Sequence, residues 1–249
     1  MNIVPNMTGK GLGPGTAAKY FLLLCDVFSN FAALFPMKEK TPSSVFTAIT
    51  TWQTIYKTAE AEIHPGFFSS IRSDADPVFM SEELHNACTN RGIALTHASP
   101  RHQEMNGLTE RTWQKIREIA FSMMVHAHVG DEFYEFSLDH AWKIFNCLPI
   151  RGLELDGRPT TPFEMFYGVK TCLERFKVLF CSIVVNIGPK IGTDGRVRHR
   201  RNNPERGVAG IHVGIPKNSD GWLCYIPSMN NTVIFSDVTF DENFESTHV

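Results

Sequence analysis

The 249-residue sequence lacks several features that would assign it to particular protein classes. It has no run of about 18 or more apolar residues, so a membrane-spanning helix is not expected. Residues 1–6 contain no basic segment leading into an apolar core, so they do not resemble a signal peptide. None of the six cysteines forms a C-x-x-C pair, so a structural zinc site is not expected either. The apolar surroundings of Cys25 and Cys181 instead indicate reduced thiols and an intracellular protein.

Acidic residues are absent from residues 1–25, whereas basic residues are concentrated near the other end. The net charge of the whole chain is −2, but residues 190–206 carry six basic and two acidic side chains, a local charge of +4. A local basic patch can bind nucleic-acid phosphates even when the whole protein is acidic. A solvated loop explains the same stretch equally well. The basic residues are Lys190, Arg196, Arg198, Arg200, Arg201 and Arg206.

The first part of the chain alternates between strand-like and helix-like patterns. Short apolar runs predict strands at 19–26, 31–37, 67–73 and 93–96. Helical spacing predicts helices after Thr41 and over 108–128 and 132–148, and Ser81 and Gly92 bracket another at 82–90. Strands followed by helices, with a β-α-β-α unit between them, predict a layered α/β domain.

The last part of the chain has a different pattern. Apolar β-rich segments at 207–215, 221–226 and 232–240 alternate with turns, and Asn230-Asn231 is a plausible hairpin turn. We therefore expect a small antiparallel β-barrel. The predicted organisation is a core domain over 1–148, a connecting segment over 149–177 and a β-rich domain over 178–249.

Two acidic residues are placed where they could support chemistry. Asp74 follows the predicted strand 67–73, and α/β domains commonly carry functional residues at such strand ends. Glu110 falls in the first turn of the long predicted helix. If that strand and helix pack together, the two carboxylates can converge on Mg²⁺, which prefers oxygen ligands. A structural role is the alternative, because Asp74 could cap a turn and Glu110 could oppose the helix dipole.

The surrounding residues favour the metal site. The 35 residues between Asp74 and Glu110 match the spacing of the second and third catalytic acids in retroviral and retrotransposon integrases. The segment 99–111 resembles the copia-type pattern of Pro, Gln and then Asn-Gly-x-x-Glu-Arg. The sequence Asp26-Val27-Phe28-Ser29, the Asn-x-x-Pro at 146–149 and the Thr-Pro-x-Glu-x-x-x-Gly at 161–168 also resemble copia-type motifs. The chain thus resembles the integrase region of a copia-type retrotransposon over nearly its whole length.

This resemblance implies an RNase H-like core, with a mixed five-stranded sheet and flanking helices, followed by an SH3-like domain. It implies DNA strand transfer by transesterification, with Mg²⁺ or Mn²⁺ held by Asp74 and Glu110. DNA would be the partner, contacted by Gln114 and Arg117 on the Glu110 face of the helix and by Arg196, Arg198, Arg200 and Arg201. A solvated helix face is the alternative for Gln114 and Arg117. The resemblance further implies a homo-oligomer that works in the nucleus on chromosomal DNA, with no membrane.

One position departs from the family. Integrases use three acids, and the first would fall near Asn2, whose amide oxygen is a poorer ligand for a hard cation. A zinc-binding His-His-Cys-Cys domain before the core is also missing. We expect truncation or decay to explain this, ahead of substitution by Asp26, which matches a family position at the end of a later strand that does not bind metal.

Two other functions compete with strand transfer. The missing acid favours a catalytically inactive nucleic-acid-binding module, which would bind DNA in a salt-dependent way without joining it. A nuclease acting on RNA–DNA hybrids would share the RNase H-like core. The Asn-Gly-Leu-Thr-Glu-Arg helix start at 106–111 and the β-rich tail argue against the nuclease.

Overall fold

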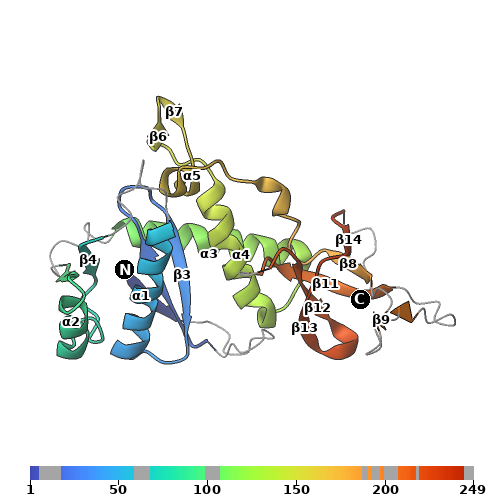
Figure 1. The fold of residues 1–249 in the computed structure, drawn as a ribbon, viewed down its shortest axis with the longest axis horizontal. Coiled ribbons are helices and arrows are strands. Elements are labelled where there is room, and N and C mark those ends of the chain that lie inside the picture. Colours follow the sequence, from blue (N-terminus) through green and yellow to red (C-terminus); the bar gives the residue numbers. More distant parts are fainter. Residues whose placement is uncertain are drawn as a thin grey trace.

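A computed structural model describes residues 1–5, 18–58, 68–98, 107–186, 190–191, 197–198, 207–216 and 219–243. The core begins with a three-stranded antiparallel sheet of order β1-β2-β3, and β4 and β5 form a parallel pair beside it (Figure 1). The Met1 amine donates a hydrogen bond to the Arg72 carbonyl at 2.5 Å, which joins the start of β1 to β4. The core strands are β1 (Asn2–Pro5), β2 (Tyr20–Cys25), β3 (Ala32–Met37), β4 (Ser70–Ser73) and β5 (Ala94–His97).

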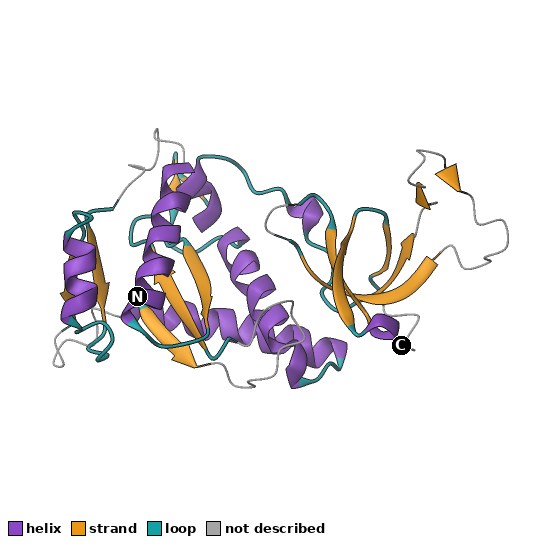
Figure 2. Cartoon of the chain, turned by 60° about the horizontal axis from the view of Figure 1, so that its bottom comes forward, coloured by secondary structure: helices purple, strands orange, loops and turns teal. Residues whose placement is uncertain are grey.

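The central strand β2 buries side chains on both of its faces. Successive residues of a strand point to opposite sides, so Leu22 and Leu24 pack into one apolar cluster and Phe21 and Leu23 into another. The first cluster lies against α1 and α2 and the second against α3 and α4 (Figure 2). The helices are α1 (Pro42–Thr58), α2 (Glu82–Thr89), α3 (Gly107–Ala127) and α4 (Tyr134–Cys147).

Several predicted element boundaries are confirmed. The Ser81 hydroxyl accepts a hydrogen bond from the Leu84 amide and caps α2, and Gly92 adopts a φ of +71° just beyond that helix. In α3, the buried residues Ile116, Ala120 and Met124 form the predicted inner side. Helix periodicity and capping residues are local sequence signals, so they suffice to predict the ends of α2 and the buried side of α3.

A short hairpin and a helix follow the core. The hairpin joins β6 (Glu154–Leu155) to β7 (Arg158–Pro159), and the helix is α5 (Pro162–Tyr167). The sequence analysis predicts only a connecting segment over 149–177, without a helix or a strand.

The last part of the chain forms a five-stranded antiparallel sheet of order β13-β12-β11-β8-β14, beside a two-stranded pair, β9 and β10. The predicted β-rich segment 232–240 is confirmed and contains two strands. The chain bends at Ser236 and Asp237, so β13 lies at one edge of the sheet and β14 pairs with β8 at the other. The strands are β8 (Ser182–Asn186), β9 (Lys190–Ile191), β10 (Val197–Arg198), β11 (Gly207–Gly214), β12 (Trp222–Ile226), β13 (Asn231–Phe235) and β14 (Val238–Asp241).

The turn between β12 and β13 lies slightly earlier than predicted. A 3-10 turn over Pro227–Met229 leads to Asn230 in the left-handed region, with φ +46°. Asn231 already pairs with Ile226 as the first residue of β13. The predicted hairpin is therefore confirmed, and its turn ends at Asn230.

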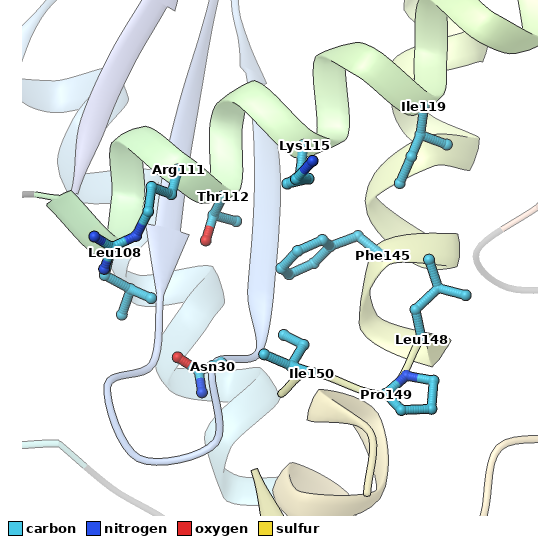
Figure 3. Close-up of a pocket in the computed structure, with 10 residues that line it drawn as sticks. All are labelled: Asn30, Leu108, Arg111, Thr112, Lys115, Ile119, Phe145, Leu148, Pro149 and Ile150. Atoms are coloured by element: carbon cyan, nitrogen blue, oxygen red, sulfur yellow. The ribbon is translucent and has the colours of Figure 1, made fainter. Parts of the chain in front are cut away.

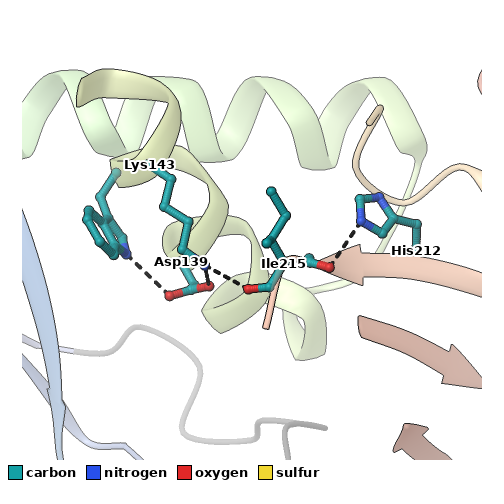
Figure 4. A network of polar contacts seen from close by, with 6 residues as sticks. Asp139, Lys143, His212 and Ile215 are labelled. Carbon is teal, nitrogen blue, oxygen red and sulfur yellow. Dashed lines mark hydrogen bonds and ion pairs between the residues drawn. The ribbon is translucent and has the colours of Figure 1, made fainter. Parts of the chain in front are cut away.

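Helix α4 lies between the core sheet and the C-terminal sheet. Its side chains share one apolar cluster with residues of both, including Leu23 of β2 and Val213 of β11. A polar contact crosses the boundary to the C-terminal sheet, because Lys143 donates a hydrogen bond to the Ile215 carbonyl at 2.9 Å (Figure 4). Lys143 also pairs with Asp139 of the same helix at 2.6 Å. The two parts of the chain are thus packed against each other through α4.

Candidate functional site

Asp74 follows β4 at the carboxyl end of the parallel pair, as predicted. Its side chain is half-buried, and its Oδ1 atom is buried without a hydrogen-bond partner among the described residues. Burial raises the pKa of this carboxyl, although a hydrogen bond from the Asp76 amide opposes the shift. Lys40 forms its ion pair with Asp76 rather than with Asp74. Asp74 therefore keeps an unused acceptor whose charge is incompletely compensated.

The start of β1 lies beside Asp74. The Met1 amine, hydrogen-bonded to the Arg72 carbonyl, interacts electrostatically with both Asp74 and the Cys25 thiol. Burial lowers the pKa of this amine. The backbone of Asn2 follows directly and pairs with Leu23, so Asn2 lies on the strand adjacent to Asp74. The side chain of Asn2 lies outside the described residues.

The first turn of α3 reaches the same end of the sheet. Burial raises the pKa of the Cys25 thiol to about 11, and this thiol hydrogen-bonds the side chains of Thr112 and Thr109. Thr109 and Thr112 are buried, whereas Glu110 between them is exposed. Electrostatic interactions link Asp74 to the Met1 amine and this amine to the Cys25 thiol, and Cys25 in turn bonds the first turn of α3. Asp74 and the turn that carries Glu110 are thus linked through Met1 and Cys25, and the Glu110 side chain itself is exposed.

A complete three-acid centre is not formed by the described part of the chain. Within it, no group of three or more His, Cys, Asp or Glu side chains is close enough together to hold a metal ion. Asp26 is engaged in the turn between β2 and β3, where its Oδ2 accepts hydrogen bonds from the Ser29 amide at 2.7 Å and the Ser29 hydroxyl at 2.6 Å. These bonds give Asp26 a structural role, which counts against its replacing the missing acid.

The predicted DNA-contacting pair lies on the exposed face of α3. The Gln114 amide donates a hydrogen bond to Glu118 at 3.0 Å, and the Arg117 guanidinium lies 5.7 Å from the centroid of the Phe121 ring. Both side chains remain exposed on the Glu110 face. Their DNA contacts stay a prediction, as does the solvated-face alternative.

The predicted basic patch falls mostly outside the described residues. Arg196, Arg200 and Arg201 lie outside them, and only the backbone of Arg198 is described, as part of the β9–β10 pair. The phosphate-binding role of this patch therefore stays a prediction.

Three of the family-like motifs have structural roles that sequence reasoning missed. Asn146 of the Asn-x-x-Pro motif is buried, and its amide bonds both the amide and the carbonyl of Ala32, at 2.8 and 2.7 Å. The Asp26-to-Ser29 motif closes the β2–β3 turn. The signal available in the sequence was a polar residue directly after the apolar Ile144 and Phe145. Such a residue, when buried by folding, needs hydrogen-bond partners.

The third motif organises α5. The Thr161 hydroxyl accepts a hydrogen bond from the Glu164 amide and caps the helix, and Gly168 ends it with a φ of +75°. The Glu164 carboxylate accepts hydrogen bonds from Arg158 at 2.6 Å and from the Thr160 hydroxyl at 2.8 Å. The Arg158 bond is the largest cause of the lowered pKa of Glu164.

Two histidines are buried where α4 meets β11. The rings of His140 and His212 lie 6.1 Å apart, and burial lowers the pKa of His140 to about 3. The ring nitrogens of His212 lie 3.2 Å from the Val178 carbonyl and 3.1 Å from the Gly214 carbonyl, and Figure 4 draws one of these two contacts. Composition alone gave no sign of this pair, because its members are 72 residues apart and meet only after folding.

The comparisons with known proteins agree with the motifs. Residues 196–248 match the family model of the retroviral polymerase SH3-like domain. The chain is 23% identical over 225 residues, 90% of its length, to the retrovirus-related Pol polyprotein from transposon RE1 of Arabidopsis thaliana. The polyprotein from transposon RE2 of the same plant is 23% identical over 224 residues, also 90% of the chain. The predicted resemblance to copia-type Pol polyproteins is confirmed.

The aligned region amounts to 14% of each of these polyproteins, so the chain spans a small part of the curated relatives it matches. The predicted fold class, an α/β core followed by a small antiparallel SH3-like domain, is also confirmed. Among the described residues, none of the helices combines the length and the apolar character needed to cross a membrane.

Similar solved structures include integrases. The HTLV-2 integrase catalytic core domain in complex with magnesium (trimeric form) is 18% identical, with a TM-score of 0.43 over 59% of this chain and 85% of that one. The intasome of simian T-cell lymphotropic virus in complex with PP2A regulatory subunit B56 gamma is 14% identical. Its TM-score is 0.48, over 96% of this chain and 82% of that one.

Proposed function

We propose that this chain is the integrase region of a retroelement polyprotein, with an RNase H-like core that transfers DNA strands. In the reaction, a 3′-hydroxyl at an element DNA end attacks a target phosphodiester, which forms one P–O bond and breaks another. The observation that carries this proposal is the buried Oδ1 atom of Asp74, which has no hydrogen-bond partner among the described residues and is linked through Met1 and Cys25 to the α3 turn that bears Glu110. The similarity to Pol polyproteins over 90% of the chain supports it.

The available donors suit a hard divalent cation. Asp74 and Glu110 offer carboxylate oxygens, which Mg²⁺ and Mn²⁺ prefer, and no other residue in the described part of the chain bonds the Oδ1 atom of Asp74. When bound, the cation would activate the attacking oxygen and stabilise the leaving oxygen. Asn2 stands on the neighbouring strand where a third carboxylate is expected, and its neutral amide would hold the cation more weakly.

The DNA partner would be held by positive and polar side chains outside the acidic site. Gln114 and Arg117 lie on the Glu110 face of α3 and could contact phosphates near the reacting strand. Arg196, Arg198, Arg200 and Arg201 would add sequence-independent attraction to the DNA backbone. We further propose that the protein works as a homo-oligomer in the nucleus, where chromosomal target DNA is found.

A catalytically inactive DNA-binding module is the second candidate. The observation that favours it is that the part of the chain that the structure describes contains no group of three or more acidic, histidine or cysteine side chains able to hold a metal ion. This candidate keeps the same fold and the same DNA contacts but predicts no strand joining with any metal.

A strand-transfer assay on duplex oligonucleotides separates the candidates. The chain is tested with Mg²⁺ and Mn²⁺, beside Glu110→Gln and the control Glu83→Gln, which changes an exposed acid on α2. The proposal expects metal-dependent joining that Glu110→Gln lowers about 100-fold or more and Glu83→Gln leaves unchanged. Salt-dependent DNA binding without joining in either metal favours the inactive module. Cleavage of RNA–DNA hybrids without joining indicates a nuclease instead.

A further inference from the structure

A pocket of about 360 Å³ lies between the start of α3, the end of α4 and the segment that follows α4 (Figure 3). The proposed strand-transfer function makes no use of it. Its volume falls within the range of small-molecule sites in proteins, roughly 300–1,000 Å³. Most of its wall is apolar, formed by Leu108, Ile119, Phe145, Leu148, Pro149 and Ile150.

Two basic side chains, Arg111 and Lys115, line the α3 side of this pocket, and none of the described residues that line it is acidic. Lys115 forms an exposed ion pair with Glu118 at 2.9 Å, which contributes little in water. Arg111 has no hydrogen bond or ion pair with another described residue, and its guanidinium lies near Gly107 at the start of α3. The helix N-terminus adds a partial positive charge there, so the pocket combines apolar walls with a positive rim.

The pocket is separate from the proposed DNA-contacting surface. Residues of an α-helix advance by about 100° each, so the α3 residues that line the pocket lie on average roughly 150° around the helix from Glu110, Gln114 and Arg117. Arg111 is at the border between the two surfaces, about 100° from Glu110 and about 60° from Gln114. Arg111 directly follows Glu110 in the Asn-Gly-x-x-Glu-Arg motif, yet it lines this other surface. The metal site therefore does not account for this arginine.

We propose that the pocket binds an organic anion with an apolar body of aromatic-ring size and one carboxylate. The apolar body would remove the walls around Phe145 and Ile150 from water, which is favourable. The carboxylate would meet Arg111, whose guanidinium matches carboxylate geometry with two parallel hydrogen bonds. Asn30 supplies an amide within the same lining. Leu148, 47% exposed at the edge of the pocket, leaves the apolar wall accessible.

Calorimetric titration of the full chain with naphthalene-2-carboxylate tests this proposal. The neutral 2-naphthamide, of nearly the same shape, measures the apolar contribution alone. The expected result is saturable one-to-one binding of the carboxylate, about tenfold tighter than binding of the amide. Absence of carboxylate binding, or equal affinity for the two compounds, would overturn the proposal.

Substitutions in and beside the pocket test whether the two compounds bind there. Arg111→Gln is expected to reduce carboxylate affinity about tenfold and amide affinity by less than about twofold. Leu148→Asp, at an exposed position, should weaken both compounds and the carboxylate more. Arg151→Gln is the matched control, because Arg151 is exposed one residue beyond the lining and its change should have no effect. An equal loss in Arg151→Gln, or Arg111-dependent binding of dAMP tighter than that of the carboxylate, would overturn the assignment.

Discussion

Asp74 and Glu164 lie in two regions of the molecule that treat a carboxylate differently. Glu164 is in the first turn of α5, where hydrogen bonds from Arg158 and Thr160 lower its pKa. Asp74 follows β4, where burial raises its pKa and Oδ1 has no partner among the described residues. The carboxylate oxygens of Glu164, which organises the fold, accept hydrogen bonds from other residues of the chain. At Asp74, one carboxylate oxygen accepts none from the described residues.

The largest expected difference between the two carboxylates is in metal affinity. Asp74→Asn should reduce Mg²⁺ affinity about 100-fold, because it removes a charged oxygen ligand, and Glu164→Gln should leave it unchanged. Calorimetric titration with Mg²⁺, repeated with Mn²⁺, measures both. If the two variants lose affinity equally, the distinction between an open and a filled carboxylate is wrong.

Acid should act through the buried histidines before it acts on either carboxylate. The pKa of His140 is lowered to about 3, so the folded state favours the neutral ring while the unfolded chain binds a proton near pH 6.5. Stability is therefore full above pH 6.5 and is lost as the pH falls toward 3, by at most about 1.4 kcal/mol per pH unit for this residue.

Urea unfolding at pH 7 and pH 5 measures this loss. His140→Phe keeps an aromatic ring beside Phe176, which His140 contacts at 5.6 Å between ring centroids. The variant should lose less stability than the parent chain between the two pH values, by up to about 2 kcal/mol. An identical loss in both proteins would assign the acid sensitivity to other groups.

Folding stability should separate the two carboxylates in the opposite sense to metal binding. Glu164→Gln weakens the bonds to Arg158 and Thr160 and should lower the free energy of unfolding by about 1–2 kcal/mol at pH 7. Asp74→Asn should cost nothing or stabilise, because the raised pKa of Asp74 means that its charged form is disfavoured in the folded state.

The two carboxylates should also change the pH dependence of folding stability in opposite directions. The lowered pKa of Glu164 stabilises the fold above about pH 4.5, and this contribution disappears as the pH falls through the folded value. The raised pKa of Asp74 has the reverse effect, with stability lost as the pH rises. Urea unfolding of both variants beside the parent chain checks the signs, and a destabilised Asp74→Asn at pH 7 would contradict them.

The smallest effect concerns the cap that positions Glu164. Thr161→Ala removes the hydroxyl that accepts the Glu164 amide hydrogen and should cost about 1 kcal/mol. Thr54→Ala, an exposed change inside α1, serves as the control with no loss expected. Thermal unfolding of both variants decides, and an equal shift in the two would remove the cap from this account.

Local patterns predicted much of the fold. The hairpin of β2 and β3, the capped helix α2 and the inner side of α3 depend on residues near one another in sequence. The bend at Ser236 and Asp237 could not be found this way, because it is set by pairing of β14 with the distant β8. The bonds of Asn146 to Ala32 likewise connect residues 114 apart.

The candidate site was predicted only in outline. Spacing and neighbouring residues selected Asp74 and Glu110 as candidate metal ligands. Whether Asp74 Oδ1 has a hydrogen-bond partner depends on the residues that the fold brings beside it, and the described residues offer none. Sequence similarity also could not distinguish motif residues with structural roles, such as Asp26 and Glu164, from those left open for chemistry. The partners of each side chain make that distinction.

Restoring the missing acid tests the central claim most directly. Asn2 lies on the strand beside Asp74, so Asn2→Asp should complete the set of three carboxylates if this end of the sheet is a metal site. Calorimetric titration of Asn2→Asp with Mg²⁺ should give an affinity about tenfold or more above that of the parent chain, and adding Asp74→Asn should abolish the gain. A folded Asn2→Asp protein that binds Mg²⁺ no more tightly than the parent would contradict the account.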